Sequence, residues 1–430
     1  MEVFPLSTNQ PSLARAWSVV FAGVGVNLCL GVLYTWSVFK ASLLKLGWSN
    51  VETQFPYTLA CLIFAACMIP GGRMVDKIGP RWVVTLGALF VGAGMLLSSA
   101  TMSVAGVTIG FGILVGAAMG FGYAAPTPAA VKWFKPHKKG LIAGLVVGGF
   151  GGASIYTAPL TTYLINKFQL KGAFFIEGIL FMVTMVILAQ FLSVPPAGFV
   201  PYGGEPPATK AATAAASKKD YSPGEMLKTP QFYLLWLMFL FGASAGLMII
   251  GHLATIGVTQ ATDPKTVVSG YILVAVLAIA NAGGRVVFGA LSDKLGRTNT
   301  MLLVFCLQAV NMFLFSHYKD GTTLLFGSIL TGAAYGACLS LFPSTTFDFY
   351  GLKNGGLNYS LVFSAWGCAA LIGPIYAGRV ADTTKALFGR PDYTEAYIVS
   401  GILMLVAAVL SLITKPPKTI TTTMGSEAKA

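Results

Sequence analysis

The stretch Gly72-Arg-Met-Val-Asp76-Lys-Ile-Gly79-Pro-Arg81 occurs a second time as Gly289-Ala-Leu-Ser-Asp293-Lys-Leu-Gly296-Arg297. The copies lie about half of the 430-residue chain apart, and each separates the end of one apolar segment from the start of the next. Matching sequences at matching places indicate a duplicated unit. In a membrane, such duplication is typical of helical bundles that hold a solute between two halves.

Composition indicates that this chain is a membrane protein. Hydrophobic residues make up 55% of the sequence and charged residues only 10%, whereas soluble domains carry about 25% charged residues. From Trp82 to Val131 there is no Asp, Glu, Lys or Arg. Because a helix needs about 20 apolar residues to cross the hydrocarbon core, this run predicts two crossings with a tight turn near Thr101–Ser103.

Apolar segments predict an all-α membrane protein with twelve transmembrane helices in two pseudo-symmetric six-helix bundles. We expect the first six helices at residues 16–39, 53–72, 82–101, 104–131, 140–166 and 173–194. The other six are expected at 230–259, 266–291, 299–318, 322–346, 355–380 and 395–414. The domains are then an N-terminal bundle at 1–194, a cytoplasmic linker at 195–229, a C-terminal bundle at 230–415 and a disordered tail at 416–430.

The net charge of +13 comes from basic residues that concentrate in alternate loops, such as Lys132, Lys135, Lys138 and Lys139 between two expected spans. This asymmetry follows the positive-inside rule. It predicts an integral protein of the cytoplasmic membrane with both termini in the cytoplasm, and it explains the charge without a nucleic-acid partner. We expect a monomer that interacts with the lipid bilayer.

The duplicated motif predicts a gate. Its aspartates can accept hydrogen bonds from the start of the next helix, where the helix dipole is positive. Its basic residues can pair with acids or helix ends of the opposite half, which would hold the cytoplasmic face closed. The alternative is anchoring by positive-inside charges. The gating residues are Gly72, Asp76, Arg81, Gly289, Asp293 and Arg297.

Other short sequences narrow the interpretation. They include Tyr34-Thr-Trp-Ser37, Trp133-Phe134, Lys139-Gly140-Leu141, Gly284-Arg285, Leu341-Phe-Pro-Ser-Thr345, Asn358-Tyr359 and, most specific, Gly224-Glu-Met-Leu-Lys-Thr-Pro-Gln-Phe232. Together with the doubled motif they resemble the major facilitator superfamily and, within it, the oxalate/formate antiporter family, the bacterial relatives of monocarboxylate transporters. The resemblance implies the twelve-helix fold, alternating access and small carboxylate substrates.

Arg285 is a basic residue well inside an expected span, after the uncharged stretch Thr266–Gly284. A charge at that depth costs at least about 2.5–3.5 kcal/mol, so it needs a partner or a function. A guanidinium matches a carboxylate bidentately. We predict that Arg285 binds a substrate carboxylate, as the resemblance also implies; the alternative is an ion pair with Glu177 or Asp348.

Other candidate substrate contacts surround this arginine. Asn281 lies four residues earlier, on the same helix face, and its amide can hydrogen-bond a substrate but cannot titrate. The resemblance implies that related monocarboxylate transporters often carry an Asp there. Small-ligand pockets combine apolar walls with a few polar groups. Hydroxyls are expected from Tyr34, Tyr123 and Tyr335, and an apolar wall from Phe363 and Cys368.

Trp366 is informative about whether the substrate carries one or two negative charges. Alignment on Asn358-Tyr359 implies that Trp366 replaces a lysine of the resembling oxalate transporter. With one cation instead of two, an oxalate dianion would leave one carboxylate unpaired, at a cost of several kcal/mol. We therefore favour a monocarboxylate such as lactate, pyruvate, formate or acetate. Trp366 could instead face lipid.

His252 and Asp348 are the candidate proton-coupling residues, although packing or gating would explain each of them as well. No catalytic triad, metal motif or cofactor motif stands out in the sequence. We therefore expect no enzyme but a secondary transporter of a small monocarboxylate, with a proton as co-substrate. The alternatives are an oxalate/formate-type anion exchanger and, from another class, a non-transporting membrane receptor or sensor.

Overall fold

The computed structural model describes residues 11–48, 50–196, 198–203, 220–261 and 270–417. Several predicted segments lie partly outside the described residues: 1–10 of the N-terminal bundle, 204–219 of the linker, 266–269 of the eighth span and 418–430 of the tail.

Helices form almost all regular structure in the described chain, and an isolated bridge joins Phe134 to Tyr202. The first half contains α1 (Leu13–Leu30), η1 (Gly31–Thr35), α2 (Trp36–Lys45), α3 (Asn50–Ile78), α4 (Pro80–Thr101), α5 (Val104–Val107), η2 (Thr108–Val115), α6 (Gly116–Ala124), α7 (Pro126–Val131), η3 (Pro136–Lys138), α8 (Lys139–Gly152) and α9 (Ser154–Ala189). The second half contains α10 (Pro223–Met226), α11 (Pro230–Gln260), α12 (Gly270–Leu295), α13 (Arg297–Phe315), α14 (Gly321–Tyr350), α15 (Gly355–Phe388) and α16 (Thr394–Ile413).

The helices confirm the predicted twelve-crossing architecture. In the described chain, 11 continuous helical stretches are long and apolar enough to span a membrane, and one of them, Pro136–Ala189, is 54 residues long. A helix that long would extend about 80 Å, far beyond a bilayer. This stretch therefore contains two crossings, and the total is twelve.

The turn between those two crossings is shorter than predicted. Spans at 140–166 and 173–194 were expected with a loop between them, but α9 runs through this region and departs from helical geometry at Gln169, where φ is 62° and ψ is 173°. One residue at positive φ is enough to redirect the chain. The sixth crossing also ends at Ala189 rather than at 194.

Two membrane helices change their winding in mid-course. The first crossing, expected at 16–39, runs from Leu13 to Lys45 and tightens to a 3₁₀ segment over η1. The fourth crossing widens to a π-helix over η2. Such segments often mark functional hinges in membrane helices. Tyr34 and Thr35 both lie on η1.

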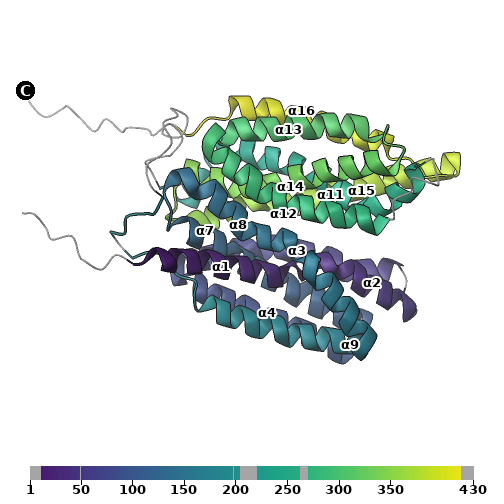
Figure 1. Ribbon diagram of the computed structural model, residues 1–430, viewed down its shortest axis with the longest axis horizontal. Helices are drawn as coiled ribbons and strands as arrows, with labels where there is room; N and C mark the ends of the chain where they lie inside the picture. The colour runs from purple at the N-terminus through teal and green to yellow at the C-terminus, as the bar shows by residue number, and fades with distance from the viewer. Residues whose placement is uncertain (1–10, 49, 197, 204–219, 262–269, 418–430) are drawn as a thin grey trace, which may run out of the picture.

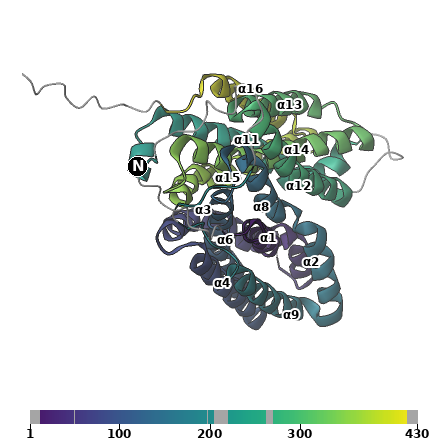
Figure 2. The same ribbon diagram turned by 60° about the vertical axis from the view of Figure 1, so that its left-hand side comes forward.

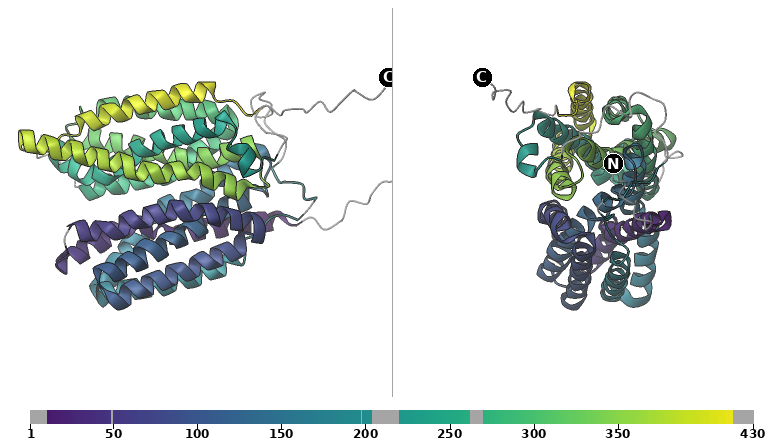
Figure 3. Two further views of the ribbon diagram at one scale, coloured as in Figure 1. Left: turned by 180° about the vertical axis from the view of Figure 1, so that it is seen from behind. Right: turned by 90° about the vertical axis from the view of Figure 1, so that its left-hand side faces the viewer.

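Figure 1 shows the two halves lying side by side, with α1–α4 and α9 in one and α11–α16 in the other. Figure 2 shows α8 and α3 at their boundary, and Figure 3 shows the same two halves from behind and end-on. There α8 packs on α12 and α14, and α3 packs on α15. We call the end of the bundle at which α1 begins and α16 ends the terminal face.

Glycines allow α8 to approach α12 closely. Gly144, Gly148 and Gly152 recur every fourth residue, and all three face α12. A Cβ on Gly144 would lie 2.2 Å from the carbonyl oxygen of Arg285. Small residues at this spacing bring helix backbones together in lipid. This contact places Arg285 against the opposite half.

Large apolar side chains cover the outer surface of the bundle. Because the hydrocarbon core solvates such side chains without cost, their exposure fits an integral membrane protein. Examples from both halves are Phe21, Leu89, Ile179, Val287, Phe326 and Leu412.

Candidate substrate-binding site

Arg285 is completely buried at the boundary between the halves. Its Nε donates to Oδ1 of Asn281 (3.0 Å), and its Nη1 donates across the boundary to the carbonyl of Val147 on α8 (2.6 Å). Its Nη2 makes no hydrogen bond of ordinary geometry, although the Tyr123 hydroxyl interacts with the guanidinium. A Cβ on Gly151 would lie 2.9 Å from Nε, so this glycine makes room for the guanidinium.

The guanidinium has no acidic partner in the described chain. Of the two acids that could pair with it, Glu177 accepts a hydrogen bond from Thr161, and Asp348 pairs with Lys139 and Arg297. The alternative of an ion pair with either acid is therefore excluded. A buried cation without a counter-ion is costly, so an anion that binds here gains a pre-formed charge partner.

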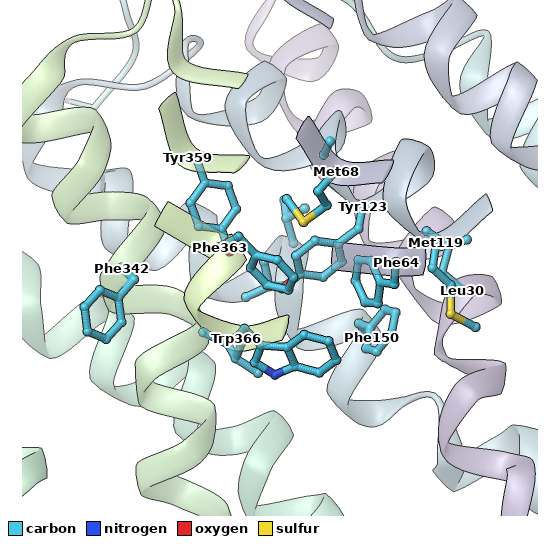
Figure 4. Close-up of a cluster of buried hydrophobic side chains, with 14 of the residues drawn as sticks. Leu30, Phe64, Met68, Met119, Tyr123, Phe150, Phe342, Tyr359, Phe363 and Trp366 are labelled. Atoms are coloured by element: carbon cyan, nitrogen blue, oxygen red, sulfur yellow. The ribbon is translucent and has the colours of Figure 1, made fainter. Parts of the chain in front are cut away.

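Aromatic rings form a continuous cluster from both halves (Figure 4). Phe64 lies 5.4 Å from the rings of both Tyr123 and Phe363, measured between centroids. Phe150 lies 5.3 Å from Tyr123, and Phe363 stacks on Trp366 at 5.2 Å. These rings exclude water, which strengthens any charge interaction inside the cluster.

Four tyrosines line this aromatic cluster. Tyr34 packs edge-on against Phe150 with centroids 5.4 Å apart. The hydroxyls of Tyr123, Tyr335 and Tyr359 are within electrostatic reach of Arg285. The buried hydroxyl of Tyr359 interacts with the hydroxyl of Tyr123. The structure thus brings together the predicted residues Arg285, Asn281, Tyr34, Tyr123, Tyr335 and Phe363.

The eleventh crossing, α15, carries two residues expected at the substrate site, Trp366 and Cys368. Trp366 is only 4% exposed, and its Nε1 donates to the Tyr335 hydroxyl (2.7 Å), which excludes the lipid-facing alternative. Cys368 lies about 140° around the helix from Phe363, because each residue turns an α-helix by about 100°. Cys368 is also partly exposed. Phe363 and Cys368 therefore point to different sides of α15, and a substrate contact at Cys368 stays a prediction.

Sequence reasoning missed three residues of the cluster, Phe64, Phe150 and Tyr359. Phenylalanine in an apolar helix carries no signal of its own, because it is equally common in any membrane span. In the sequence, Tyr359 stands out only as part of the short match Asn358-Tyr359 to the resembling family. A polar hydroxyl one turn before Phe363 was the one available signal.

The proton-coupling candidates lie away from Arg285. The His252 ring nitrogens contact the Pro374 carbonyl (2.9 Å) and the Tyr393 hydroxyl (3.4 Å), towards the face opposite the terminal face. Asp348 is bound by Lys139 (3.0 Å) and by Arg297 (2.8 Å) near the terminal face. Asp348 therefore takes part in a contact between the halves, as a gating residue would.

The two motif aspartates join the halves at the terminal face. Asp76 accepts from the backbone N–H groups of Gly356 (3.1 Å) and Leu357 (2.9 Å) at the start of α15. Asp293 accepts from Gly140 and Leu141 at the start of α8, both at 2.8 Å. Both aspartates accept hydrogen bonds from a helix start, as predicted. Each helix start belongs to the opposite half, however, so the prediction that it would be the next helix in the chain is wrong.

The motif glycines explain how these junctions form. A Cβ on Gly72 would lie 2.3 Å from the Gly356 carbonyl oxygen, and a Cβ on Gly289 would lie 2.4 Å from that of Gly140. Any larger residue would separate the backbones. We call these contacts the Asp76 junction and the Asp293 junction.

The basic motif residues differ between the junctions. Arg297 is 4% exposed and binds Asp293 (2.7 Å) and Asp348. Arg81 is exposed and lies over the ring of Trp82, 5.4 Å from its centroid. Near the Asp76 junction, burial lowers the pKa of Lys132, and the charges of Asp76 and Asp220 oppose this shift.

Proteins named as carboxylate transporters align along most of the chain. The oxalate:formate antiporter of Oxalobacter formigenes is 28% identical over 94% of this chain and 92% of its own length. Monocarboxylate transporter 13 of Rattus norvegicus is 24% identical over 80% of this chain and 76% of its own. The solved structure of the proton:xylose symporter XylE shares the fold, with a TM-score of 0.68 at 12% identity, over 93% of this chain and 95% of that one.

The sequence profile of the Major Facilitator Superfamily matches residues 16–319. This match covers more than half of the chain, and the twelve-helix architecture agrees with it. The chain therefore belongs to the Major Facilitator Superfamily of membrane transporters.

Proposed function

We propose that this protein is a secondary transporter of a small monocarboxylate of the lactate, pyruvate, formate or acetate type, coupled to a proton and working by alternating access. The observation that carries the proposal is Arg285, completely buried at the boundary of the halves with no hydrogen bond of ordinary geometry at Nη2 and no acid beside it. An organic anion would supply the missing charge and accept that N–H.

The surroundings of Arg285 favour one carboxylate over two. Among the described residues, the side chains within electrostatic reach of the guanidinium are tyrosines rather than a second cation, namely Tyr123, Tyr335 and Tyr359. Trp366 uses its N–H on Tyr335. A second carboxylate would lose its hydration without meeting a cation, which costs several kcal/mol. A short apolar remainder such as a methyl group would instead pack against Phe363 and Phe150.

Alternating access follows from the position of the site. Arg285 lies about 15 Å along α12 from its end at Leu295, which is close to mid-membrane. The halves are joined at the terminal face by the Asp76 and Asp293 junctions. Opening these junctions would expose the site to that side, which is the cytoplasmic side if the basic loops follow the positive-inside rule.

An Arg285→Lys variant tests the carboxylate site. Lysine keeps the charge but loses the planar fork, so we expect substrate-induced thermal stabilisation and proteoliposome uptake to fall by about 10- to 100-fold, equivalent to roughly 1.4–3 kcal/mol. The assay panel is formate, acetate, lactate, pyruvate and oxalate.

Arg379→Lys is the matched control, because Arg379 is exposed. Wild-type uptake in Arg285→Lys would contradict the proposal. Flux that requires preloaded oxalate or formate would favour the exchanger, which the similarity to the Oxalobacter antiporter makes the second candidate. Binding without any flux would identify a receptor.

A further inference from the structure

Glu177 is a completely buried carboxyl group that the proposed substrate site does not use. It lies on α9, eight residues beyond Gln169, or about 12 Å along the helix. Its Oε1 accepts from the Thr161 hydroxyl (2.5 Å), and its Oε2 has no hydrogen-bond partner.

No cation neutralises this carboxyl group in the described chain. From α2, Phe39 stacks on Phe174, and no salt bridge between described residues involves the neighbouring Lys40. From α4, Met95 lies against Gly178. The titratable side chain within electrostatic reach is that of Tyr156, whose hydroxyl donates to the Leu28 carbonyl (3.1 Å). An isolated carboxylate in such a place is unfavourable, so burial favours the protonated form of this group.

Threonine hydroxyls extend from Glu177 towards the aromatic cluster. Thr157 lies one turn before Thr161, and its hydroxyl donates to the Ala153 carbonyl (3.0 Å). The Thr35 hydroxyl, 2.6 Å away, must then act as the donor to Thr157. Thr35 follows Tyr34 on η1, and Tyr34 packs on Phe150 beside the substrate site. The row therefore ends at the 3₁₀ segment that also carries a predicted substrate contact.

From this geometry we propose that Glu177 is the binding site for the co-transported proton, and that the threonine row and η1 connect its protonation to the substrate site. Arg285 cannot release a proton in proteins, and the Asn281 amide does not titrate. One proton on Glu177 and one anion on Arg285 move together without net charge. The proton binds when the carboxyl faces one side and leaves when it faces the other. This inference rests on the proposed carboxylate transport.

Glu177→Gln tests the inference in proteoliposomes with radiolabelled lactate and pyruvate. With one proton per anion, an inwardly directed gradient of about one pH unit should drive about tenfold accumulation, because that gradient is worth about 1.4 kcal/mol. Protein-free liposomes give the passive leak of the neutral acid. We expect Glu177→Gln to lose gradient-driven accumulation but to keep exchange of lactate against preloaded lactate.

Glu395→Gln is the matched control, because this glutamate accepts an exposed hydrogen bond from Tyr376 and should keep coupling. If Glu177→Gln does not fold, Thr161→Val and Thr161→Ser replace it. Valine should change the pH dependence of uptake, and serine, which retains the hydroxyl, should restore it. Normal coupling in Glu177→Gln, or in Thr161→Val, would overturn the inference.

Two further outcomes separate this inference from the proposed function. Wild-type protein that exchanges lactate or pyruvate with no response to a pH gradient would overturn the proton site and leave carboxylate transport intact. Absence of any flux or thermal shift with the carboxylate panel would overturn both, and Arg285→Lys would then behave like wild type.

Discussion

The Asp76 and Asp293 junctions share a backbone arrangement but differ in charge. In each, a motif aspartate accepts two N–H bonds from a helix start of the opposite half, and a motif glycine touches the same helix start. Only the Asp293 junction contains the buried network of Lys139, Asp348 and Arg297 among the described residues. At matching positions the Asp76 junction has Gly355 and Pro80.

This difference shows which contacts are common to both copies of the motif and which occur only in the second copy. Aspartate, glycine and a helix start suffice to bring the halves together, because the carboxylate meets unpaired N–H groups at the positive end of a helix dipole. The ion network makes the Asp293 junction more costly to open, since its charges are removed from water and depend on each other. We therefore expect the Asp76 junction to open more easily.

Arg297→Leu should have the largest effect. It leaves Asp293 and Asp348 without their buried partner, and breaking such a pair typically costs about 3–5 kcal/mol. The expected result is a lower thermal unfolding temperature in detergent and faster hydrogen exchange at the start of α8.

Arg81→Leu is the control, because Arg81 is exposed and contacts only the Trp82 ring among the described interactions. Its effect should stay within about 0.5 kcal/mol. Equal losses in the two variants would show that the copies are energetically alike, and would remove the asymmetry between the junctions.

Gly140→Ala and Gly72→Ala should have intermediate and similar effects. The added Cβ would lie 2.1 Å from the Gly289 carbonyl oxygen in the first and 2.3 Å from that of Gly356 in the second. Forced overpacking costs about 1–3 kcal/mol. Amide hydrogen exchange should therefore become faster at the start of α8 in the first variant and at the start of α15 in the second.

Gly283→Ala provides the matched control on α12, because no atom lies within 4 Å of its added Cβ. It should stabilise the helix by about 0.5–1 kcal/mol. If the two junction variants behaved like this control, close backbone contact would not hold the terminal face together.

Asp76→Asn should have the smallest effect of the junction variants. The amide keeps one acceptor oxygen and loses the other, which costs about 1 kcal/mol. Hydrogen exchange should quicken at Gly356 and Leu357 and stay unchanged at Gly140. Asp293→Asn should cost more, since it also removes a partner of Arg297. The reverse order would contradict a stronger Asp293 junction.

Individual residues show which parts of the site could be predicted from the sequence. Arg285 was predictable, because a charge in an uncharged span is conspicuous whatever surrounds it. The aspartates were predicted to bind helix starts, but the sequence could not say which helix, since the partners lie more than 150 residues away. Phe64 and Phe150 gave no signal, and Glu177 was expected only as a possible ion-pair partner of Arg285, because the sequence does not show which helix faces meet.

The sequence by itself determined the twelve crossings, the duplication and the buried cation, because lipid forces backbone groups into helices and makes every charge within a span stand out. Only the tertiary structure decided that the halves meet through opposite helix starts, that Trp366 faces inward, and that Glu177 has one unpartnered oxygen. These features depend on which helix faces lie together, and apolar helices in a bilayer do not encode their neighbours by hydrophobicity alone.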